Sequence, residues 1–277
     1  MLITTPAREI RIYPRRFERA VAVVMLTLLA SQTTLALVVC GLDVPHAKLS
    51  PASRALDDKT WVGVDTFPYS EKDLSPMMNG NDGLFYTVPK FVQHAGDECR
   101  DSLTKFYEAA LPPSGEGDVL DLCSSWTSHY PKGWKGKRVV ALGLNPLELM
   151  ANPSKTETVR QDLNVSPKLP FDDASFDLIT NSLSVDYMTK PLELFSEMGR
   201  VLKPGGYACM AFTNRCFPTK VVPIWTKPFT EAHHAQVVGA YFHFSETDWE
   251  VGVADVSPDG WVGQRDPMVV VVGRKAS

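Results

Sequence analysis

Residues 161–207, QDLNVSPKLPFDDASFDLITNSLSVDYMTKPLELFSEMGRVLKPGGY, contain the alternation of elements that decides the fold. Phe176–Thr180 (FDLIT) is a short apolar run, which is typical of a buried strand. Leu192–Leu202 has apolar residues at helical spacing, and Pro204-Gly205-Gly206 ends this predicted helix. Another apolar run, Tyr207–Phe212, follows the glycines. The stretch therefore predicts a strand, a helix, a turn and a second strand in succession.

The same alternation continues on both sides of this stretch. Further strands are predicted at Val119–Leu122, Arg138–Leu142, Thr158–Gln161, Trp249–Asp255 and Met268–Val272, and further helices at Lys90–Leu111 and Thr230–Phe244. Strands that alternate with helices form a parallel sheet covered on both faces, and right-handed crossovers make that sheet doubly wound. We therefore predict an α/β fold: a Rossmann-like, doubly wound, seven-stranded and mostly parallel sheet with an antiparallel C-terminal strand.

The N-terminal residues differ in composition from the rest of the chain. Residues 1–19 contain five arginines and two glutamates, and Ala20–Val39 is an apolar run about long enough to span a bilayer. Three interpretations compete: a membrane anchor, a cleaved signal, and part of an organelle transit sequence. A buried soluble helix is a fourth. An anchor with its basic end inside would carry the following domain across the membrane, so we favour a targeting segment.

These patterns divide the chain into three parts. We expect a targeting or anchor segment at residues 1–42, a linker or covering segment rich in Pro, Asp and Ser at 43–84, and the main domain at 85–277. The predicted localisation is a plastid or mitochondrion after processing, or association with a membrane through residues 20–39.

Overall charge and cysteine spacing exclude several classes of function. The formal net charge of the 277 residues is −4, which does not favour nucleic-acid binding. Five cysteines (Cys40, Cys99, Cys123, Cys209 and Cys216) show no C-x-x-C spacing, so we predict neither a metal site nor a disulfide framework. The absence of a G-x-G-x-x-G after the first strand argues against a nicotinamide-dependent enzyme. The absence of a G-x-S-x-G motif likewise argues against a serine hydrolase.

Several motifs occur in a fixed order in the opening stretch: Asp162 after a strand, Leu169-Pro170-Phe171, Ser175-Phe176-Asp177 and Arg200-Val201-Leu202-Lys203-Pro204-Gly205-Gly206. In this order they resemble class I S-adenosylmethionine-dependent methyltransferases, in particular the type 11 small-molecule branch. The resemblance covers about Phe85 to Lys275. The chain is similar to a subgroup of this branch that has three further features. All three are present here: Ser124-Ser125-Trp126, Gly143-Leu144-Asn145 and a segment from Asn214 to Lys220.

The resemblance implies that S-adenosylmethionine binds in the loops that follow the strands, at their carboxyl ends. In this family the first such loop has an acidic residue and alternating glycines, which let backbone N–H groups approach the methionine part of the cofactor. Asp121 matches the acid, and Cys123 and Ser125 stand where glycines are usual. The hydroxyls of Ser124 and Ser125 can donate hydrogen bonds there. Ser182 follows the fourth strand, near the predicted transfer point.

Two more loops are implied in cofactor binding. After the second strand the family has an acid for the ribose hydroxyls, but Gly143 occupies that position, and Asn145 can accept one such bond. After the third strand, Asp162 and Leu163 match the pair that meets the adenine. The alternative for Asp162 is a side chain that only caps its loop.

The sequence indicates the catalytic residues only weakly. His94 and Tyr86 lie on the N-terminal covering segment, and His129 follows the cofactor loop, so each can be a general base near neutral pH. Tyr187 is a further candidate. His233-His234 on a late helix has no metal-ligand partner at suitable spacing and is interpreted as surface.

Two functions therefore remain. The first is methyl transfer from S-adenosylmethionine to an unidentified small molecule. The alternative is a catalytically inactive protein of the same fold that acts as a binding or assembly factor, possibly at a membrane. A structure with Trp126 filling the cofactor pocket favours the alternative, whereas an open pocket above Asp121 counts against it. Neither the acceptor nor the oligomeric state follows from the sequence.

Overall fold

The computed structural model describes residues 37–57, 59–78, 82, 86–259 and 266–277. Within this part, one sheet has seven strands in the order β5-β4-β3-β6-β7-β9-β8. The strands are β3 (Asp118–Leu122), β4 (Arg138–Gly143), β5 (Glu157–Arg160), β6 (Phe176–Ser182), β7 (Leu202–Phe212), β8 (Trp249–Asp255) and β9 (Val269–Lys275). The neighbouring strands β5, β4, β3, β6 and β7 pair in parallel. β9 lies between β7 and β8 and runs antiparallel to both. The predicted fold class is confirmed.

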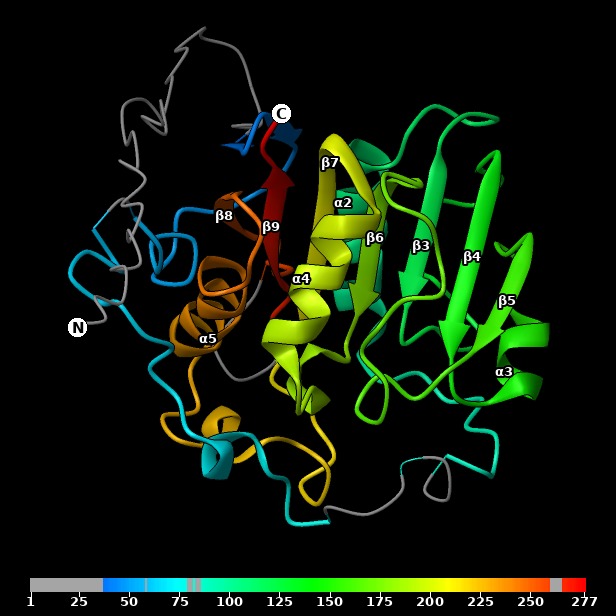
Figure 1. Ribbon diagram of the computed structural model, residues 1–277. Helices are drawn as coiled ribbons and strands as arrows, with labels where there is room; N and C mark the ends of the chain where they lie inside the picture. The colour runs from blue at the N-terminus through cyan, green and yellow to red at the C-terminus, as the bar shows by residue number, and fades with distance from the viewer. Residues whose placement is uncertain (1–36, 58, 79–81, 83–85, 260–265) are drawn as a thin grey trace, which may run out of the picture.

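Helices cover both faces of this sheet (Figure 1). α4 (Pro191–Val201) and α5 (Glu231–His243) lie on one face, and α2 (Asp97–Ala110) lies on the other. The buried apolar side chains accordingly form two clusters, one with α4 and α5 and one with α2. The short α3 (Pro146–Ala151) follows β4. The parallel strands point downward in Figure 1, so their carboxyl ends meet at one end of the molecule.

The motifs quoted from residues 161–207 meet in space. The guanidinium of Arg200, at the end of α4, donates to the carbonyl oxygens of Leu169 (2.9 Å) and Phe171 (2.8 Å). Lys203 Nζ donates to Asp177 Oδ2 (2.8 Å), which also accepts the backbone N–H of Asp118 (2.8 Å). The end of α4 and the start of β7 therefore hold the loop before β6 and the start of β3, which explains why these residue types occur together.

The first predicted helix begins later than expected. The sequence pattern predicted Lys90–Leu111, but α2 starts at Asp97 with Gly96 as its N-cap. Acidic residues in the first turn favour this start, because they interact with the helix dipole. Residues 90–95 are not helical, since their backbone makes contacts to the main domain that are described below. The other predicted elements differ from the observed bounds by five residues or fewer.

A small hairpin packs beside the edge of the sheet. β1 (Leu37–Val39) pairs with β2 (Leu42–Val44), and a Cβ on Gly252 of β8 would lie 2.7 Å from Val39. The last three residues of the predicted apolar run 20–39 thus form a strand, and the others lie outside the described residues. No helix in the described part of the chain is long and apolar enough to cross a membrane. The predicted membrane-spanning run lies outside the described residues except for its last three positions.

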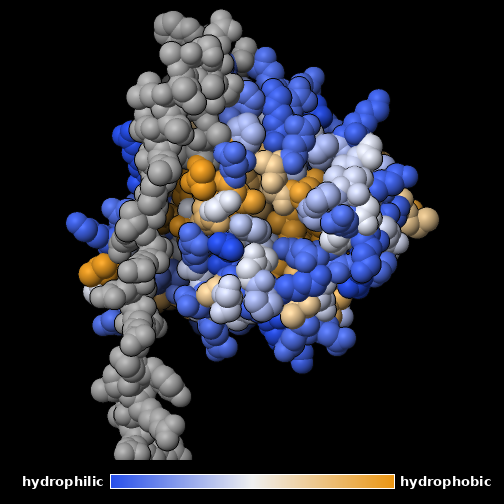
Figure 2. Space-filling model, turned by 90° about the horizontal axis from the view of Figure 1, so that it is seen from above, coloured by the Kyte–Doolittle hydropathy of each residue, from blue (hydrophilic) through white to orange (hydrophobic). Residues whose placement is uncertain are grey.

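The face at which the parallel strands begin is shown in Figure 2. Hydrophobic side chains gather near its middle, and hydrophilic ones surround them. Val38 of β1 has 57% of its surface exposed. The predicted membrane contact through residues 20–39 stays a prediction, because most of that run is not described.

Aromatic side chains from the described part of residues 43–78 pack against α5. Trp61 stacks on His243 with ring centroids 5.9 Å apart, and Phe67 lies 6.1 Å from Tyr241. Downstream of these rings, η1 (Glu71–Leu74) contacts η3 (Pro223–Thr226). The described part of the segment predicted as linker or cover therefore lies against the main domain, and the division of the chain into three parts stays a prediction.

The interpretation of His233-His234 as surface is wrong for His234. The residue is 1% exposed, its ring stacks on Trp225 with centroids 4.0 Å apart, and its Nε2 lies 2.7 Å from the Trp225 carbonyl oxygen. The cause is the position of His234 on the buried side of α5, where η3 covers it. Burial lowers the pKa of this imidazole to about 4.

The five cysteines are free thiols, spread over several layers of the fold. Cys40, Cys99 and Cys209 are buried, and Cys123 and Cys216 are partly buried. Burial raises the pKa of each thiol, to about 12 for Cys40, Cys99 and Cys123.

Candidate functional site

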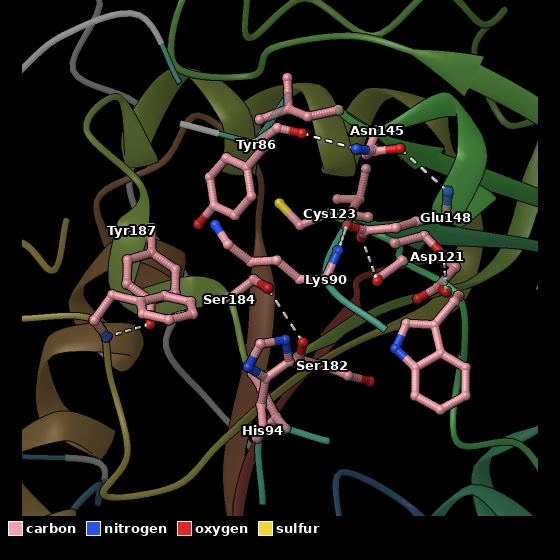
Figure 3. A pocket seen from close by; sticks show the side chains of 18 of the residues that line it. Tyr86, Lys90, His94, Asp121, Cys123, Asn145, Glu148, Ser182, Ser184 and Tyr187 are labelled. Atoms are coloured by element: carbon pink, nitrogen blue, oxygen red, sulfur yellow. Dashed lines mark hydrogen bonds between the residues drawn. The ribbon is translucent and has the colours of Figure 1, made fainter. Parts of the chain in front are cut away.

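A cavity of about 560 Å³ opens at the carboxyl ends of β3, β4, β6 and β7. All of the predicted cofactor and catalytic residues line it: Asp121, Cys123, Ser124, Ser125, Asn145, Asp162, Leu163, Ser182, His94, His129 and Tyr187. Figure 3 shows several of these side chains converging from different loops. The topology thus brings together residues that are up to 93 positions apart, from His94 to Tyr187.

The carboxylate of Asp121 organises the loop after β3. It is 2% exposed and accepts three hydroxyl hydrogen bonds, from Ser124 (2.6 Å), Ser128 (2.7 Å) and Thr180 (2.9 Å). Asn152 supports the same loop by donating to the hydroxyls of Ser128 (2.8 Å) and Ser124 (3.2 Å). Burial raises the pKa of Asp121, and the three hydroxyls oppose that shift. Side-chain hydrogen bonds therefore fix a loop that glycines usually shape in the methyltransferases that this chain resembles.

Cys123 has the backbone conformation that a glycine would adopt. Its φ is +54°, in the left-handed region that costs L-residues about 1–2 kcal/mol. The loop then passes across the end of β4, where a Cβ on Gly143 would lie 2.2 Å from the Ser124 carbonyl oxygen. Gly143 therefore has no room for a side chain. This contact explains why the usual acid is missing from that position.

A cover segment, residues 86–96, closes one side of the cavity. Asn145 Nδ2 donates to the carbonyl oxygens of Tyr86 (2.8 Å) and Thr87 (3.3 Å). The backbone N–H of Lys90 donates to Glu148 Oε1 (2.6 Å), whose other oxygen accepts from Ser125 Oγ (2.5 Å). The cover segment is thus tied to α3 and to the loop after β3.

Asn145 has little capacity left for a ligand. Its Oδ1 caps α3 by accepting the backbone N–H groups of Leu147 (2.9 Å) and Glu148 (3.2 Å). Its Nδ2 holds the cover segment. The side chain lines the cavity as predicted, but its hydrogen bonds serve the fold.

Trp126 lies in the cavity wall and binds the cover segment. Its indole Nε1 donates to the Val92 carbonyl oxygen (3.3 Å), and its ring meets that of Phe91 edge-on with centroids 6.3 Å apart. The cavity above Asp121 remains open. Trp126 therefore does not fill the pocket, which is the arrangement that would have favoured an inactive binding factor.

Asp162 and Leu163 sit after β5, where the adenine was expected. Asp162 Oδ1 accepts the backbone N–H groups of Asn164 (3.0 Å) and Val165 (3.3 Å), which is the loop-capping role. Leu163 is buried in the apolar cluster. Both residues line the cavity, so the capping of the turn and a cofactor contact are compatible.

Ser182, at the end of β6, bonds to the buried Tyr107 of α2 through its Oγ (2.7 Å). Its carbonyl oxygen accepts the Ser184 hydroxyl (3.2 Å). Both serines line the cavity on the side that His94 faces (Figure 3).

The other half of the cavity is aromatic and carries a cation. Lys90 Nζ lies 4.6 Å from the centroid of the Tyr86 ring and 5.3 Å from that of Phe217. The Tyr187 ring lies 6.0 Å from Phe217, and its hydroxyl accepts the backbone N–H of Phe217 (2.8 Å). Burial lowers the pKa of Lys90, and Glu148 raises it. An ammonium near two rings gains cation–π stabilisation.

The three candidate bases differ in their surroundings. Burial lowers the pKa of His94 below its usual 6.5 and that of His129 to about 4. Burial raises the pKa of Tyr187, so this phenol keeps its proton at neutral pH. Because the best base has a pKa near the working pH, His94 fits the task better than His129 or Tyr187. No group of His, Cys, Asp or Glu in the described residues is arranged to hold a metal ion.

Comparison with known proteins identifies the central segment. Residues 122–210 match the family model described as "Methyltransferase domain". This segment is a methyltransferase domain of the type 11 branch. It contains the loop after β3 and most of the stretch that predicted the fold.

Curated relatives match parts of the chain. The demethylmenaquinone methyltransferase of Paenarthrobacter aurescens is 33% identical over 114 residues, which are 41% of this chain and 44% of that protein. The malonyl-[acyl-carrier protein] O-methyltransferase of Marinomonas sp. is 36% identical over 58 residues, 21% of this chain and 22% of the relative. This chain thus spans less than half the length of these two relatives.

Solved structures of methyltransferases are also similar. One from Mesorhizobium loti is 18% identical, with a TM-score of 0.42, and the match covers 61% of this chain and 95% of that one. One from Aquifex aeolicus is 16% identical, with a TM-score of 0.44 and coverage of 69% and 96%.

Sequence reasoning missed two residues of the site, Glu148 and Lys90. Glu148 was not among the predicted site residues, and Lys90 was placed in the first predicted helix. The signal for Glu148 was its position in the first turn of a helix that follows a strand, which faces the ligand side of such sheets. Lys90 carried no signal, because its position depends on how the cover segment folds back.

Proposed function

We propose that this protein transfers a methyl group from S-adenosylmethionine to a small-molecule acceptor that is not yet identified. The observation that carries the proposal is the open cavity at the carboxyl ends of the strands, into which the loops of the methyltransferase domain project Asp121, Glu148 and Asp162. Its volume lies within the range of about 300–1,000 Å³ that is typical of small-molecule sites.

The residues present fit the cofactor. By the resemblance, Asp162 would accept a hydrogen bond from the adenine amine, and the loop held by Asp121 would bind the methionine part; both line the cavity. When bound, S-adenosylmethionine supplies an already activated methyl group, so the protein has mainly to align the acceptor and remove its proton.

The aromatic half of the cavity is where we place the acceptor. Tyr86, Tyr187 and Phe217 provide flat apolar surfaces, and Lys90 provides a positive charge among them. We propose His94 as the general base, because it lines the same region and burial keeps its imidazole neutral at pH 7. An acidic acceptor with a ring or chain fits this combination.

The relatives act on different acceptors, by their names, demethylmenaquinone and malonyl-[acyl-carrier protein]. They support methyl transfer without selecting one acceptor for this chain. Localisation to a plastid, a mitochondrion or a membrane also stays a proposal, since residues 1–36 lie outside the described part.

The test is calorimetric titration of the full chain with S-adenosylhomocysteine, followed by incubation with methyl-labelled S-adenosylmethionine and small-molecule extracts. We expect micromolar binding, and transfer of label to at least one compound. The proposal fails if well-folded protein binds no S-adenosylhomocysteine. In that case the alternative of a non-catalytic binding factor takes its place.

A further inference from the structure

The loss of the acid at the end of β4 has a steric cause. A Cβ on Gly143 would lie 2.2 Å from the Ser124 carbonyl oxygen and 3.2 Å from a methyl carbon of Leu149. No carboxylate can therefore project from this position while the loop after β3 takes its present path. Any acid that binds the ribose has to come from another element.

A carboxylate from α3 lies near the same end of β4. Glu148, in the first turn of α3, is 6% exposed and lines the cavity. Figure 3 shows it between Asn145 and Asp121, on the side of the cavity away from Tyr187. A buried carboxylate is costly unless it is paired or hydrogen-bonded, so the hydrogen bonds of Glu148 decide whether it can also serve a ligand.

The hydrogen bonds of Glu148 leave room for a ligand. Oε1 accepts the Lys90 N–H (2.6 Å) and Oε2 accepts the Ser125 hydroxyl (2.5 Å). An ionised carboxylate offers about four acceptor positions, so each oxygen retains capacity for one more donor. Two neighbouring hydroxyls of a ribose match this arrangement, because they present two donors side by side.

The neighbouring polar side chains are less suitable. Both ends of the Asn145 amide are engaged by α3 and by the cover segment. Asp121 already accepts three hydroxyls. Asp162 belongs to the loop after β5, where the adenine is expected.

We propose that Glu148 is the carboxylate that binds the ribose hydroxyls of S-adenosylmethionine, in place of an acid at the end of β4. The proposal rests on the proposed function and adds to it a residue from α3. It also gives the cover segment a role, because the same carboxylate holds the Lys90 N–H beside the ribose.

The test is a thermodynamic cycle with two ligands and two forms of the full chain. Calorimetry compares S-adenosylhomocysteine with its 2′-deoxy and 3′-deoxy analogues on wild type and on Glu148→Gln. A hydrogen bond to a charged group corresponds to about a 10- to 100-fold change in affinity. We expect Glu148→Gln to lower the affinity for S-adenosylhomocysteine by that factor. The affinity for at least one deoxy analogue should fall by no more than about threefold.

Matched variants separate binding from folding. Glu193→Gln changes an exposed glutamate of α4 outside the cavity and should leave every affinity unchanged. Glu148→Asp retains the charge but withdraws it by one methylene, so we expect a smaller loss that is again specific to the hydroxylated ligand. Thermal melting of each variant checks that the fold is intact.

Two outcomes overturn the proposal. Equal weakening of all ligands by Glu148→Gln would mean that Glu148 only shapes the cavity, while the proposed function would stand. If folded wild type binds none of the ligands, the proposed function and this inference fall together.

Discussion

The two halves of the cavity are built in different ways. The half that we propose for the cofactor consists of polar side chains that hydrogen-bond to one another, with Asp121 receiving three hydroxyl hydrogen bonds. The half that we propose for the acceptor consists of aromatic rings around Lys90. Asp186 of η2 (Val185–Tyr187), directly before Tyr187 of this half, is a carboxyl that is 3% exposed. Among the described residues, Asp186 Oδ2 has no hydrogen-bond partner.

The difference shows how one fold can hold a constant ligand and a variable one. A saturated hydrogen-bond network has one arrangement, so it suits a cofactor that never changes. Aromatic surfaces impose fewer directional demands and tolerate changes in the molecule that packs on them. The two buried carboxyls, Asp121 and Asp186, give the sharpest way to examine this contrast.

The largest expected effect is on pH-dependent stability, through Asp186. Burial raises its pKa to about 8, so the folded protein keeps this proton while the unfolded chain releases it above about pH 4. The stability present below pH 4 is then lost as the pH rises to about 8. Relative to Asp186→Asn, the unfolding free energy of wild type should fall by up to about 1.4 kcal/mol per pH unit in this window.

Urea unfolding at several pH values between 5 and 8 measures this slope. Parallel curves for wild type and Asp186→Asn would show that Asp186 is ionised in the folded protein, and would remove the contrast with Asp121.

Removal of the saturated carboxyl should have the next largest effect. Asp121→Ala leaves three buried hydroxyls without their common acceptor, which should lower the unfolding free energy by about 3 kcal/mol. Asp121→Asn keeps one acceptor oxygen and should lose less. Chemical denaturation measures both, and calorimetry should show that S-adenosylhomocysteine binding weakens in the same order. A loss below about 1 kcal/mol in the alanine variant would mean that the network contributes little.

A change in the acceptor half should alter rate and leave cofactor affinity alone. His94→Asn removes the proposed base, so kcat should fall about 100-fold. In wild type, kcat/KM should rise with pH through the pKa of His94, below 6.5, and then level off. The measurement uses the first acceptor that the labelled-cofactor screen returns. An unchanged pH profile in the variant would reject His94 as the base, as would weaker binding of S-adenosylhomocysteine.

The smallest effect is expected at Cys123. Glycine relieves the strain of the left-handed backbone but gains freedom in the unfolded chain, so Cys123→Gly should change stability by less than about 1 kcal/mol. Cys123→Val should be clearly destabilising, because a β-branched side chain tolerates this conformation poorly. Thermal melting distinguishes the two. If the valine variant melts like wild type, the loop is more adaptable than its hydrogen bonds suggest.

Most of the fold could be predicted from sequence, because local signals agreed with one another. The strand at Phe176, the helix before Pro204 and the glycines after it are each marked by periodicity or by residues that end an element. The start of α2 could not be predicted, since Lys90 leaves helical geometry to contact Glu148, a residue 58 positions away.

The site was predicted in part for the same reason. Strand order places Asp121, Asp162 and Ser182 at one edge of the sheet, and they do line one cavity. The sequence did not reveal how Asp121 and Asn152 would compensate for missing glycines, or that the Ser124 carbonyl would exclude a side chain at Gly143. Those facts depend on contacts between loops, which no local pattern encodes.

The five thiols give the molecule a set of internal reporters. Alkylating reagents attack thiolates, and burial keeps these groups protonated near neutral pH. Modification of the buried Cys40, Cys99 and Cys209 therefore requires the surrounding layer to open, whereas Cys123 and Cys216 are partly exposed in the cavity wall. Cys40 reports on the hairpin, Cys99 on α2, Cys209 on the centre of the sheet, Cys123 on the cofactor half and Cys216 on the acceptor half. The order in which the buried thiols react records the sequence of local openings. A bound ligand should slow the modification of Cys123 more than that of the other thiols.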